Sequence, residues 1–168
     1  MTQKLATRVL ITYFSSSGNT KKMAYAISEG ATKEGVETVV KDIQDVKADE
    51  LLRYEGIIIG SPTYYGTAAY QIKKLIDESV RLHGELDGKV GAAFTSSANI
   101  GGGNETTILS IVQAMLIHGM IIQGDANGDH YGAVAIDQPD ARAIKQCRRL
   151  GERTAQLVKK LFLTGTKQ

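Results

Sequence analysis

The stretch "RVLITYFSSSGNTK", residues 8–21, joins a short apolar run to a loop of hydroxyls and glycine, and the loop leads into a helical pattern. A short apolar run with polar ends is typical of a strand that is buried on both faces of a parallel sheet. The loop offers hydroxyls, backbone N–H groups and a helix N-terminus, which together suit a compact anion such as a phosphate monoester. In the alternative interpretation, Ser17 or Asn19 only caps the helix and Gly18 only supplies a left-handed turn. One cap residue is enough for that, so the long polar run favours a phosphate site.

Outward from this stretch, short apolar runs alternate with longer helical patterns. The predicted strands cover residues 8–13, 37–42, 56–61, 89–96 and 119–125. The predicted helices cover residues 19–35, 48–56, 70–84, 106–119 and 140–162. This alternation predicts an α/β protein with a doubly wound parallel sheet of five strands and helices on both faces. A chain of 168 residues is about the length of one domain, so we expect a single domain over residues 1–168.

Composition excludes several classes of protein. Lys and Arg total 20 against 18 for Asp and Glu, a balance too weak for a nucleic-acid-binding face. The basic run "KQCRRLGER", residues 145–153, is most simply a solvated helix face. Cys147 is the only cysteine, which rules out an intrachain disulfide and indicates a reducing compartment. No segment reads as a signal peptide or a membrane span, so we expect a cytoplasmic protein without membrane insertion. No cluster has metal-ligand spacing, so no metal is predicted.

Two further loops follow predicted strands at the edge where ligands of doubly wound sheets bind. Residues 61–70, "SPTYYGTAAY", carry Tyr64 and Tyr65, which could offer a face to a planar ring or pack back onto the protein. Residues 95–107, "TSSANIGGGNETT", carry three consecutive glycines, which allow close approach of the backbone to a flat group or form a merely flexible loop. Together with the first loop they predict a pocket for a phosphorylated planar ligand, with flavin mononucleotide (FMN) as the leading candidate.

These loops resemble the flavodoxin-like superfamily, whose first loop follows the pattern [ST]-x-[ST]-G-N-T, which residues 15–20 match. The chain is most similar to the WrbA-type NAD(P)H:quinone oxidoreductases, through "GSPTYYG", "FTSSANIGGGNETTIL" and "HGMII". The resemblance implies strand order 2-1-3-4-5, FMN bound without a covalent link, two-electron transfer from NAD(P)H to a quinone, and a homo-oligomer (dimer or tetramer). It also implies two sets of contacts. The phosphate would lie on Ser15, Ser16, Ser17, Gly18, Asn19 and Thr20. The isoalloxazine ring would lie between Pro62, Thr63, Tyr64, Tyr65 and Gly66 on one side and Ser96, Ser97, Ala98, Asn99, Ile100, Gly101, Gly102 and Gly103 on the other.

The chain departs from that family at several positions around the ring. Tyr64 replaces an arginine, Ile117 replaces the first histidine of a pair, the family's active-site tryptophan has no counterpart, and the family's long insertion before the third strand is reduced. His130, in "GDHYG", could compensate for the missing histidine, although a lone loop histidine is more often only solvated. We therefore predict His130, Tyr64 and Tyr65 as the catalytic rim, and His83 and His118 as structural or surface residues.

A one-electron carrier of the flavodoxin type is the rival function. Such carriers are usually strongly acidic around the flavin, whereas this chain has a net charge of +2 and loops with few charges apart from Glu105 and Asp129. Sparse charge does not oppose a fully reduced, anionic flavin, so it favours two-electron chemistry. A low-molecular-weight phosphatase is excluded because its first loop needs a cysteine, whereas Cys147 lies in the last predicted helix. A phospho-acceptor domain is excluded because no acidic pair follows the first strand.

Overall fold

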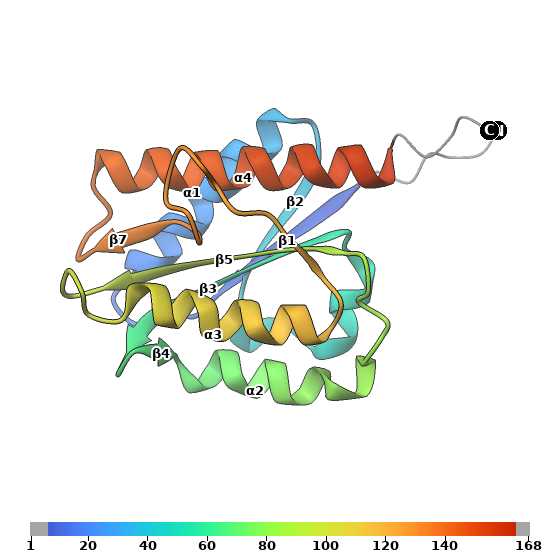
Figure 1. Ribbon diagram of the computed structural model, residues 1–168, viewed down its shortest axis with the longest axis horizontal. Helices are drawn as coiled ribbons and strands as arrows, with labels where there is room; N and C mark the ends of the chain where they lie inside the picture. Colours follow the sequence, from blue (N-terminus) through green and yellow to red (C-terminus); the bar gives the residue numbers. More distant parts are fainter. Residues whose placement is uncertain (1–6, 164–168) are drawn as a thin grey trace.

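The protein, described by a computed structural model over residues 7–163, is a layered α/β structure built on one sheet (Figure 1). The path through the sheet runs β2-β1-β3-β5-β6, and these neighbours are parallel. The strands on this path are β1 (Arg8–Tyr13), β2 (Glu37–Asp42), β3 (Gly56–Tyr64), β5 (Val90–Ser97) and β6 (Ile121–Ile122). The predicted doubly wound sheet and its order 2-1-3-4-5 are therefore confirmed, with β5 and β6 as the fourth and fifth strands along this path.

Helices cover both faces of the sheet, with α1 and α4 on one side and α2 and α3 on the other in Figure 1. The α-helices are α1 (Asn19–Lys33), α2 (Tyr70–Glu78), α3 (Asn104–Ile117) and α4 (Ala141–Phe162). Short 3₁₀ helices occupy η1 (Ile43–Asp45), η2 (Ala48–Arg53) and η3 (Ser79–Leu82). Strand residues alternate between two buried clusters, because successive side chains point to opposite faces: Val9 and Ile11 join α1 and α4, whereas Leu10 joins the other cluster.

The helices α1 and α4 approach each other backbone to backbone through two glycines. A Cβ placed on Gly30 would lie 2.0 Å from the carbonyl oxygen of Arg148, and one on Gly151 would lie 2.0 Å from that of Ile27. No real side chain fits at such distances. Each glycine is therefore required by the close packing of this helix pair.

The third strand extends beyond its predicted end at residue 61. β3 continues to Tyr64 and turns back as an antiparallel hairpin with β4 (Thr67–Ala68). The turn residues Tyr65 and Gly66 both have positive φ, 51° and 78°, as a two-residue hairpin turn of type I′ requires. The loop predicted over residues 61–70 therefore contains a hairpin that the sequence did not indicate, because a Tyr-Gly pair does not carry the usual Asn-Gly signal of such a turn.

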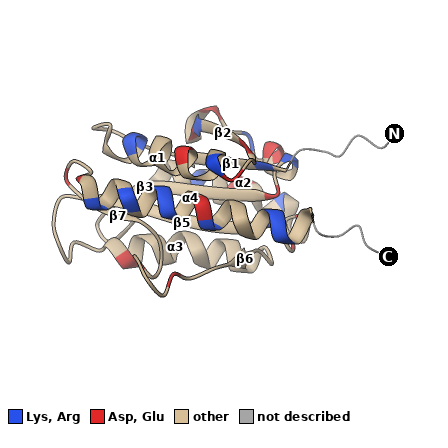
Figure 2. Ribbon diagram, turned by 90° about the horizontal axis from the view of Figure 1, so that it is seen from above, with Lys and Arg blue, Asp and Glu red and all other residues tan. Residues whose placement is uncertain are grey.

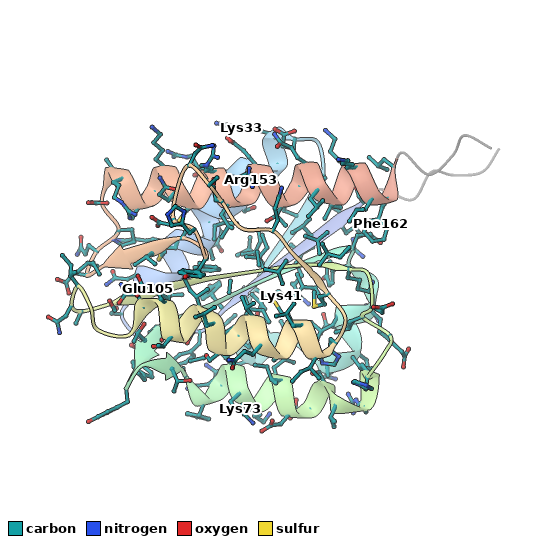
Figure 3. All side chains as sticks on the ribbon, viewed as in Figure 1. Lys33, Lys41, Lys73, Glu105, Arg153 and Phe162 are labelled. Carbon is teal, nitrogen blue, oxygen red and sulfur yellow. The ribbon has the colours of Figure 1, made fainter. Side chains whose placement is uncertain are left out.

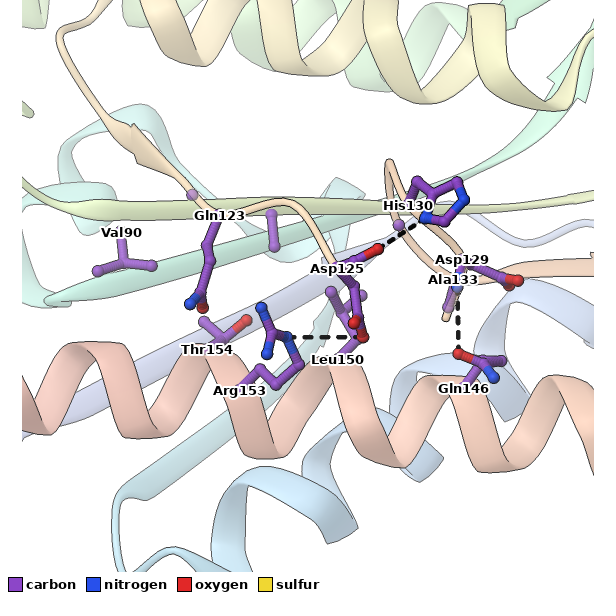
Figure 4. A pocket seen from close by; sticks show the side chains of 13 residues that line it. Val90, Gln123, Asp125, Asp129, His130, Ala133, Gln146, Leu150, Arg153 and Thr154 are labelled. Atoms are coloured by element: carbon purple, nitrogen blue, oxygen red, sulfur yellow. Dashed lines mark hydrogen bonds and ion pairs between the residues drawn. The ribbon is translucent and has the colours of Figure 1, made fainter. Parts of the chain in front are cut away.

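The fifth strand is split, which the sequence pattern did not indicate. Only Ile121–Ile122 of the predicted run 119–125 pair with the start of β5, and β7 (Val134–Ile136) pairs with its end. The intervening residues 123–133 leave the sheet and lie against α4 (Figure 4). Ion pairs between this segment and α4 hold it away from the sheet.

Asp125 holds the segment of residues 123–133 against α4. Its carboxylate binds the guanidinium of Arg149 through two nitrogens and lies 3.5 Å from Nε of Arg153. Arg153 also donates a 2.8 Å hydrogen bond to the carbonyl oxygen of Gly124. The arginines hold the pKa of Asp125 below its usual 3.8, at about 2. The expectation of a merely solvated basic face was therefore wrong for Arg149 and Arg153, because their acidic partner lies in a segment predicted as strand.

Two predicted helices also end differently. Residues 48–53 form the 3₁₀ helix η2 in place of the α-helix predicted over 48–56, since the chain must enter β3 at Gly56. The helix predicted over 70–84 is α at 70–78 and 3₁₀ at 79–82. Within residues 7–163, no helix combines the length and the apolar content needed to cross a bilayer.

Candidate functional site

Three loops meet at the carboxyl edge of the sheet, where β1, β3 and β5 end (left in Figure 1). They are the first loop (residues 14–18), the hairpin β3–β4 and the third loop (residues 98–103). Parallel strands bring their carboxyl ends to one side, so these loops are neighbours even though the sequence separates them widely.

The first loop leads into α1 without a side-chain cap. Gly18 occupies the N-cap position with φ 91°, and no side chain caps the helix there. Ser15 Oγ accepts from the N–H groups of Gly18 (3.1 Å) and Lys21 (3.3 Å). Neither Ser17 nor Asn19 acts as the cap, so the capping alternative does not account for them. Among residues 7–163, the N–H groups of Asn19 and Thr20 have no acceptor, as expected for an open helix start.

The space in front of Gly18 is open. A Cβ built on this residue would meet no heavy atom within 4 Å. The side chains of Ser16 and Ser17 beside it are exposed. The first loop and the start of α1 therefore combine exposed serine hydroxyls with N–H groups that have no acceptor within residues 7–163.

Two hydrogen bonds join segments at this edge: one links the start of α1 to the end of β5, and the other links the first loop to the hairpin. Oγ1 of Thr20 lies 2.8 Å from Oγ of Ser96, and both residues are buried. The Tyr64 hydroxyl donates to Oγ of Ser16 across 3.0 Å. The hydroxyl of Thr20 thus joins the start of α1 to the end of β5, and its role as a phosphate ligand stays a prediction.

The tyrosines of the hairpin differ in their surroundings. Tyr64 is 42% exposed and reaches toward the first loop, whereas Tyr65 at the turn is fully exposed. The alternative that both pack back onto the protein does not hold for Tyr65. The hairpin itself is anchored by Ser61, which is fully buried and whose Oγ accepts from the N–H of Ala69 at 2.8 Å. Ser61 is a positioning residue that the sequence pattern did not single out, because its role depends on a partner across the hairpin.

Two of the three glycines in the third loop have a reason within the chain. A Cβ on Gly102 would lie 2.9 Å from the carbonyl oxygen of Asn99, and one on Gly103 would lie 2.5 Å from Cα of Gly66. Only at Gly101, with φ 69°, would a Cβ meet nothing within 4 Å. Close contacts within the chain therefore account for glycine at positions 102 and 103, and contact of the triplet with a flat ligand stays a prediction.

The polar end of the third loop is well ordered by its own contacts. Oγ of Ser97 lies 2.8 Å from Oδ1 of Asn104 and 3.0 Å from the carbonyl oxygen of Asn99. Ala98, Asn99 and Ile100 are exposed between them, Ile100 by 89%. A merely flexible loop is not what the structure shows, since a buried Asn104 anchors its end.

A groove of about 660 Å³ lies on the far side of the third loop, between the starts of α3 and α4 and the segment before β7. Ile100, Glu105 and Tyr131 stand along it. Its floor is the outer edge of β7, where Asp129 accepts from the N–H of Val134 at 2.9 Å and Arg142 donates to the carbonyl of Val134 at 3.1 Å. Asp129 and Arg142 also pair with each other. This pair occupies backbone groups that a further strand would otherwise use.

His130 lies in the segment between β6 and β7 (Figure 4), and it also lines the groove beside the third loop. Its ring is exposed, and Nδ1 is 2.7 Å from the carbonyl oxygen of Asp125. The structure thus places His130 at the same sheet edge as the three loops, beyond the third one. Its role toward a ligand remains a prediction.

The remaining histidines lie at the other end of α3. Nε2 of His118 is 2.8 Å from Oγ of Ser79, and its ring is 6.3 Å from that of His83. Burial, together with the nearby His83, lowers the pKa of His118. His118 therefore has a packing role away from the loop edge. In the part of the chain that the structure describes, no group of His, Cys, Asp and Glu side chains is arranged to hold a metal ion.

The fold and the hydroxyl-rich edge define a doubly wound α/β protein with three loops joined around an uncapped helix start. The chain belongs to the flavodoxin family: residues 10–109 match the family model for the flavodoxin domain. A flavodoxin of Aquifex aeolicus (strain VF5) is 38% identical over 170 residues, covering 96% of this chain and 91% of the relative. An NAD(P)H dehydrogenase (quinone) of Sinorhizobium fredii is 34% identical over 195 residues, covering 92% of this chain and 98% of the relative. The solved structure of a WrbA-like flavodoxin from Agrobacterium tumefaciens superposes with a TM-score of 0.79 at 25% identity, covering 93% and 99% of the two chains.

Proposed function

We propose that the protein is a flavoprotein that holds FMN without a covalent bond and passes two electrons from NAD(P)H to a small quinone. The observation that carries the proposal is the uncapped start of α1, where N–H groups without an acceptor in residues 7–163 lie next to exposed serines. Membership of the flavodoxin family supports the cofactor, and a relative called NAD(P)H dehydrogenase (quinone) supports the reaction.

The first loop fits a phosphate monoester by its donor set. An anion at a helix start accepts hydrogen bonds from free N–H groups and is favoured by the positive end of the helix dipole. Asn19 and Thr20 would supply N–H groups, and Ser16 and Ser17 would supply hydroxyls. Ser15 would hold the turn, since its Oγ already accepts from Gly18 and Lys21.

The hairpin and the third loop fit the planar part of the cofactor. Tyr64 would bound the ring on one side, and the open backbone at Gly101 would approach it on the other. When bound, FMN would supply the acceptor and donor of hydride, so no side chain needs to act as a nucleophile. The residues' task is to bind, orient and exclude water. Tyr65 and His130 would border the place where the nicotinamide and the quinone alternate.

A one-electron carrier is the second candidate, because a relative with 38% identity is called flavodoxin. Charge separates the two functions. The three loops carry no Asp or Glu, and the exposed carboxylate nearest to the third loop in sequence is Glu105. A carrier that docks by electrostatics would have an acidic rim, which steers basic partners. The absence of acidic residues from the three loops supports the enzyme over the carrier.

Anaerobic mixing of the FMN-loaded protein with NADH and, in parallel, with NADPH tests the proposal. We expect at least one nucleotide to bleach the flavin absorbance in a single phase, and a small quinone to restore it. A protein whose absorbance changes with neither nucleotide, but which is reduced once a separate reductase is added, would be a carrier. Stopped-flow absorbance distinguishes these outcomes, and a variant with Tyr65→Ala should slow the nucleotide reaction while leaving the FMN content unchanged.

A further inference from the structure

The end of α3 is joined to η3 by a contact between two side chains. Nε2 of His118 lies 2.8 Å from Oγ of Ser79, and this hydroxyl also donates a 2.7 Å hydrogen bond to the carbonyl oxygen of Ile76. A hydroxyl has one proton to donate, and a carbonyl oxygen can only accept. The ring must therefore be the donor in its contact with Ser79, which makes Nε2–H the tautomer of His118.

The other ring nitrogen of His118 has no partner. Nδ1 is buried and makes no hydrogen bond to any group in residues 7–163. The neutral Nε2–H ring leaves only a lone pair at this atom, whereas the imidazolium would place a proton there without an acceptor. Burying a charged group with an unsatisfied donor costs more than burying a neutral ring. The packing of His118 against Ser79 therefore suits the neutral ring and disfavours the charged one.

The surroundings of the ring offer little to solvate a charge. A cavity of about 30 Å³ beside His118 is lined by Ser79 and otherwise by apolar side chains. Figure 2 shows α3 mostly uncharged, and its only charged residue, Glu105, is labelled at the opposite end of the helix in Figure 3. The ring of His83 lies 6.3 Å away, so a second positive charge there would repel the first. Burial, and after it His83, lower the pKa of His118 from its ordinary 6.5.

The charged groups of the neighbouring elements do not reverse this preference. They are Lys73, Lys74, Asp77 and Glu78 on α2, Arg81 on η3, Asp49, Glu50 and Arg53 on η2, and Glu85, Asp87 and Lys89 in residues 83–89. Ion pairs engage most of them, and the others apart from Asp87 are exposed or donate to backbone carbonyls. The carboxylate of Asp87 lies beside Gly119, the residue after His118. A carboxylate there would favour a charged ring, yet the pKa of His118 is lowered, so burial outweighs it.

We propose that the contact between His118 and Ser79 is a pH-sensitive lock on the last turn of α3. The neutral ring donates to Ser79 and holds α3 against η3. When His118 takes up a proton at Nδ1, the charged ring turns to water and the last turn opens. The helix ends directly afterwards, at Gly119 with φ 79°, so this turn can open while the start of α3 stays on the core. The lock is at the opposite end of α3 from the third loop and does not depend on the proposed redox activity.

The direction of the pH dependence follows from the lowered pKa. The unfolded or opened chain binds a proton on His118 near pH 6.5, whereas the closed state does so only at lower pH. The lock therefore contributes its full stabilisation above about pH 6.5, and this contribution is lost as the pH falls below that value.

Hydrogen exchange of the full chain over a pH series tests the lock. The amides of His118, Gly119 and Met120 bond to carbonyl oxygens of α3 at 3.2, 3.0 and 3.1 Å, so they report opening of its last turn. After correction for intrinsic exchange, their protection should fall about threefold or more from about pH 7.5 to about pH 5.5. His118→Gln keeps a donor in the place of Nε2 but cannot take up a proton, so its protection should stay nearly constant. The control, His130→Gln, replaces an exposed histidine elsewhere and should show the fall of the parent.

NMR titration of the histidine ring in the parent protein is a second measurement, which decides the matter if His118→Gln does not fold. We expect the ring nitrogens of His118 to show the Nε2–H tautomer at neutral pH and a titration midpoint below 6.5. The Nδ1–H tautomer, or a midpoint at or above 6.5, overturns the proposal. So does protection that stays constant with pH in the parent, that falls as steeply in His118→Gln, or that no longer falls in the control.

Discussion

Glycines occur in two regions of the molecule with opposite consequences. Between α1 and α4, Gly30 and Gly151 leave room that the backbone of the neighbouring helix fills, with carbonyl oxygens 2.0 Å from where a Cβ would be. At the carboxyl edge, Gly18 and Gly101 leave room in which a Cβ would meet no atom within 4 Å. The first pair serves packing, and the second leaves space that only a ligand or solvent can occupy.

The two regions also use different forces. The helix pair buries apolar side chains and small residues, so its stability comes from close contact over the core. The loop edge is held by single hydroxyl contacts, such as Thr20 to Ser96 and Tyr64 to Ser16. Substitutions in the helix pair should therefore change the free energy of unfolding, whereas substitutions at the edge should act mainly on ligand affinity.

The largest expected effect is that of Gly151→Ala. The added Cβ would force α1 and α4 apart, so the free energy of unfolding should fall by about 3 kcal/mol, the upper part of the range for overpacking. Urea unfolding followed by circular dichroism measures this change. Lys145→Ala on the exposed side of α4 should change stability by less than about 0.5 kcal/mol. Equal stability of Gly151→Ala and parent would mean that the helix contact is not tight.

Thr20→Val should lower both the free energy of unfolding and the affinity for FMN. The buried Oγ of Ser96 would lose its partner, which costs about 1–2 kcal/mol of stability, and the first loop would no longer be fixed to β5. We expect weaker FMN binding as a result, measured by quenching of flavin fluorescence. Thr20→Ser keeps the hydroxyl and should keep most of the affinity. If the serine and valine variants bind FMN with equal affinity, the hydrogen bond between Thr20 and Ser96 has no part in FMN binding.

Asp125→Asn should produce a smaller effect that depends on pH. The arginines lower the pKa of Asp125 in the folded protein from 3.8 to about 2, so its ionised form stabilises the fold above about pH 4 and loses that contribution as the pH falls toward 2. We expect the variant to be less stable by about 1 kcal/mol at neutral pH, because its partners are partly exposed and screened.

The difference in the free energy of unfolding between the parent and Asp125→Asn should shrink as the pH falls from about 4 to about 2, because the parent carboxylate becomes protonated in that range. Urea unfolding over a pH series measures it. Asp49→Asn, which breaks an exposed pair with Arg81, is the control and should cost little at any pH. A stability difference for Asp125→Asn that stays constant down to pH 2 would contradict the ion-pair account of the split strand.

The smallest effect is expected for Tyr64→Phe. This variant keeps the ring and removes a half-exposed hydrogen bond to Ser16, which contributes about 0.5 kcal/mol. FMN affinity should fall about twofold, the equivalent of that energy. Tyr64→Ala removes the ring as well and should weaken binding further. Equal affinity of the alanine variant and the parent would exclude Tyr64 from the ring site.

The sequence predicted the parts of the fold that depend on local pattern. The doubly wound sheet and four of its strands follow from short apolar runs alternating with helices, and the first loop was placed at a helix start. The strand order was implied by the resemblance to the flavodoxin-like superfamily. The split fifth strand could not be predicted, because the partners of Asp125 are Arg149 and Arg153, far along the chain. The hairpin at Tyr65 was missed because its turn residues are atypical.

The position of the site could be predicted from the sequence, but the contacts of its single residues could not. The three loops could be placed at one edge from topology alone, but the purpose of each residue depended on contacts between loops. The sequence did not indicate the hydrogen bond between the hydroxyls of Thr20 and Ser96. It also did not indicate that backbone atoms of Asn99 and Gly66 lie close to where a Cβ on Gly102 or Gly103 would be. Local spacing shows which residue types are present, but not whether they face a ligand or each other.

Titration of the purified protein with FMN and with riboflavin tests the central claim most directly. The two ligands share the ring and differ in the phosphate, which only the open start of α1 would recognise. We predict that FMN binds at least tenfold more tightly than riboflavin, because charge-assisted hydrogen bonds from N–H groups and hydroxyls to a phosphate are worth about 1.4 kcal/mol or more. Absorbance and fluorescence titrations at fixed ionic strength give both affinities. Equal affinity for the two ligands would contradict the phosphate site, and binding of neither would contradict the assignment of this edge to a flavin.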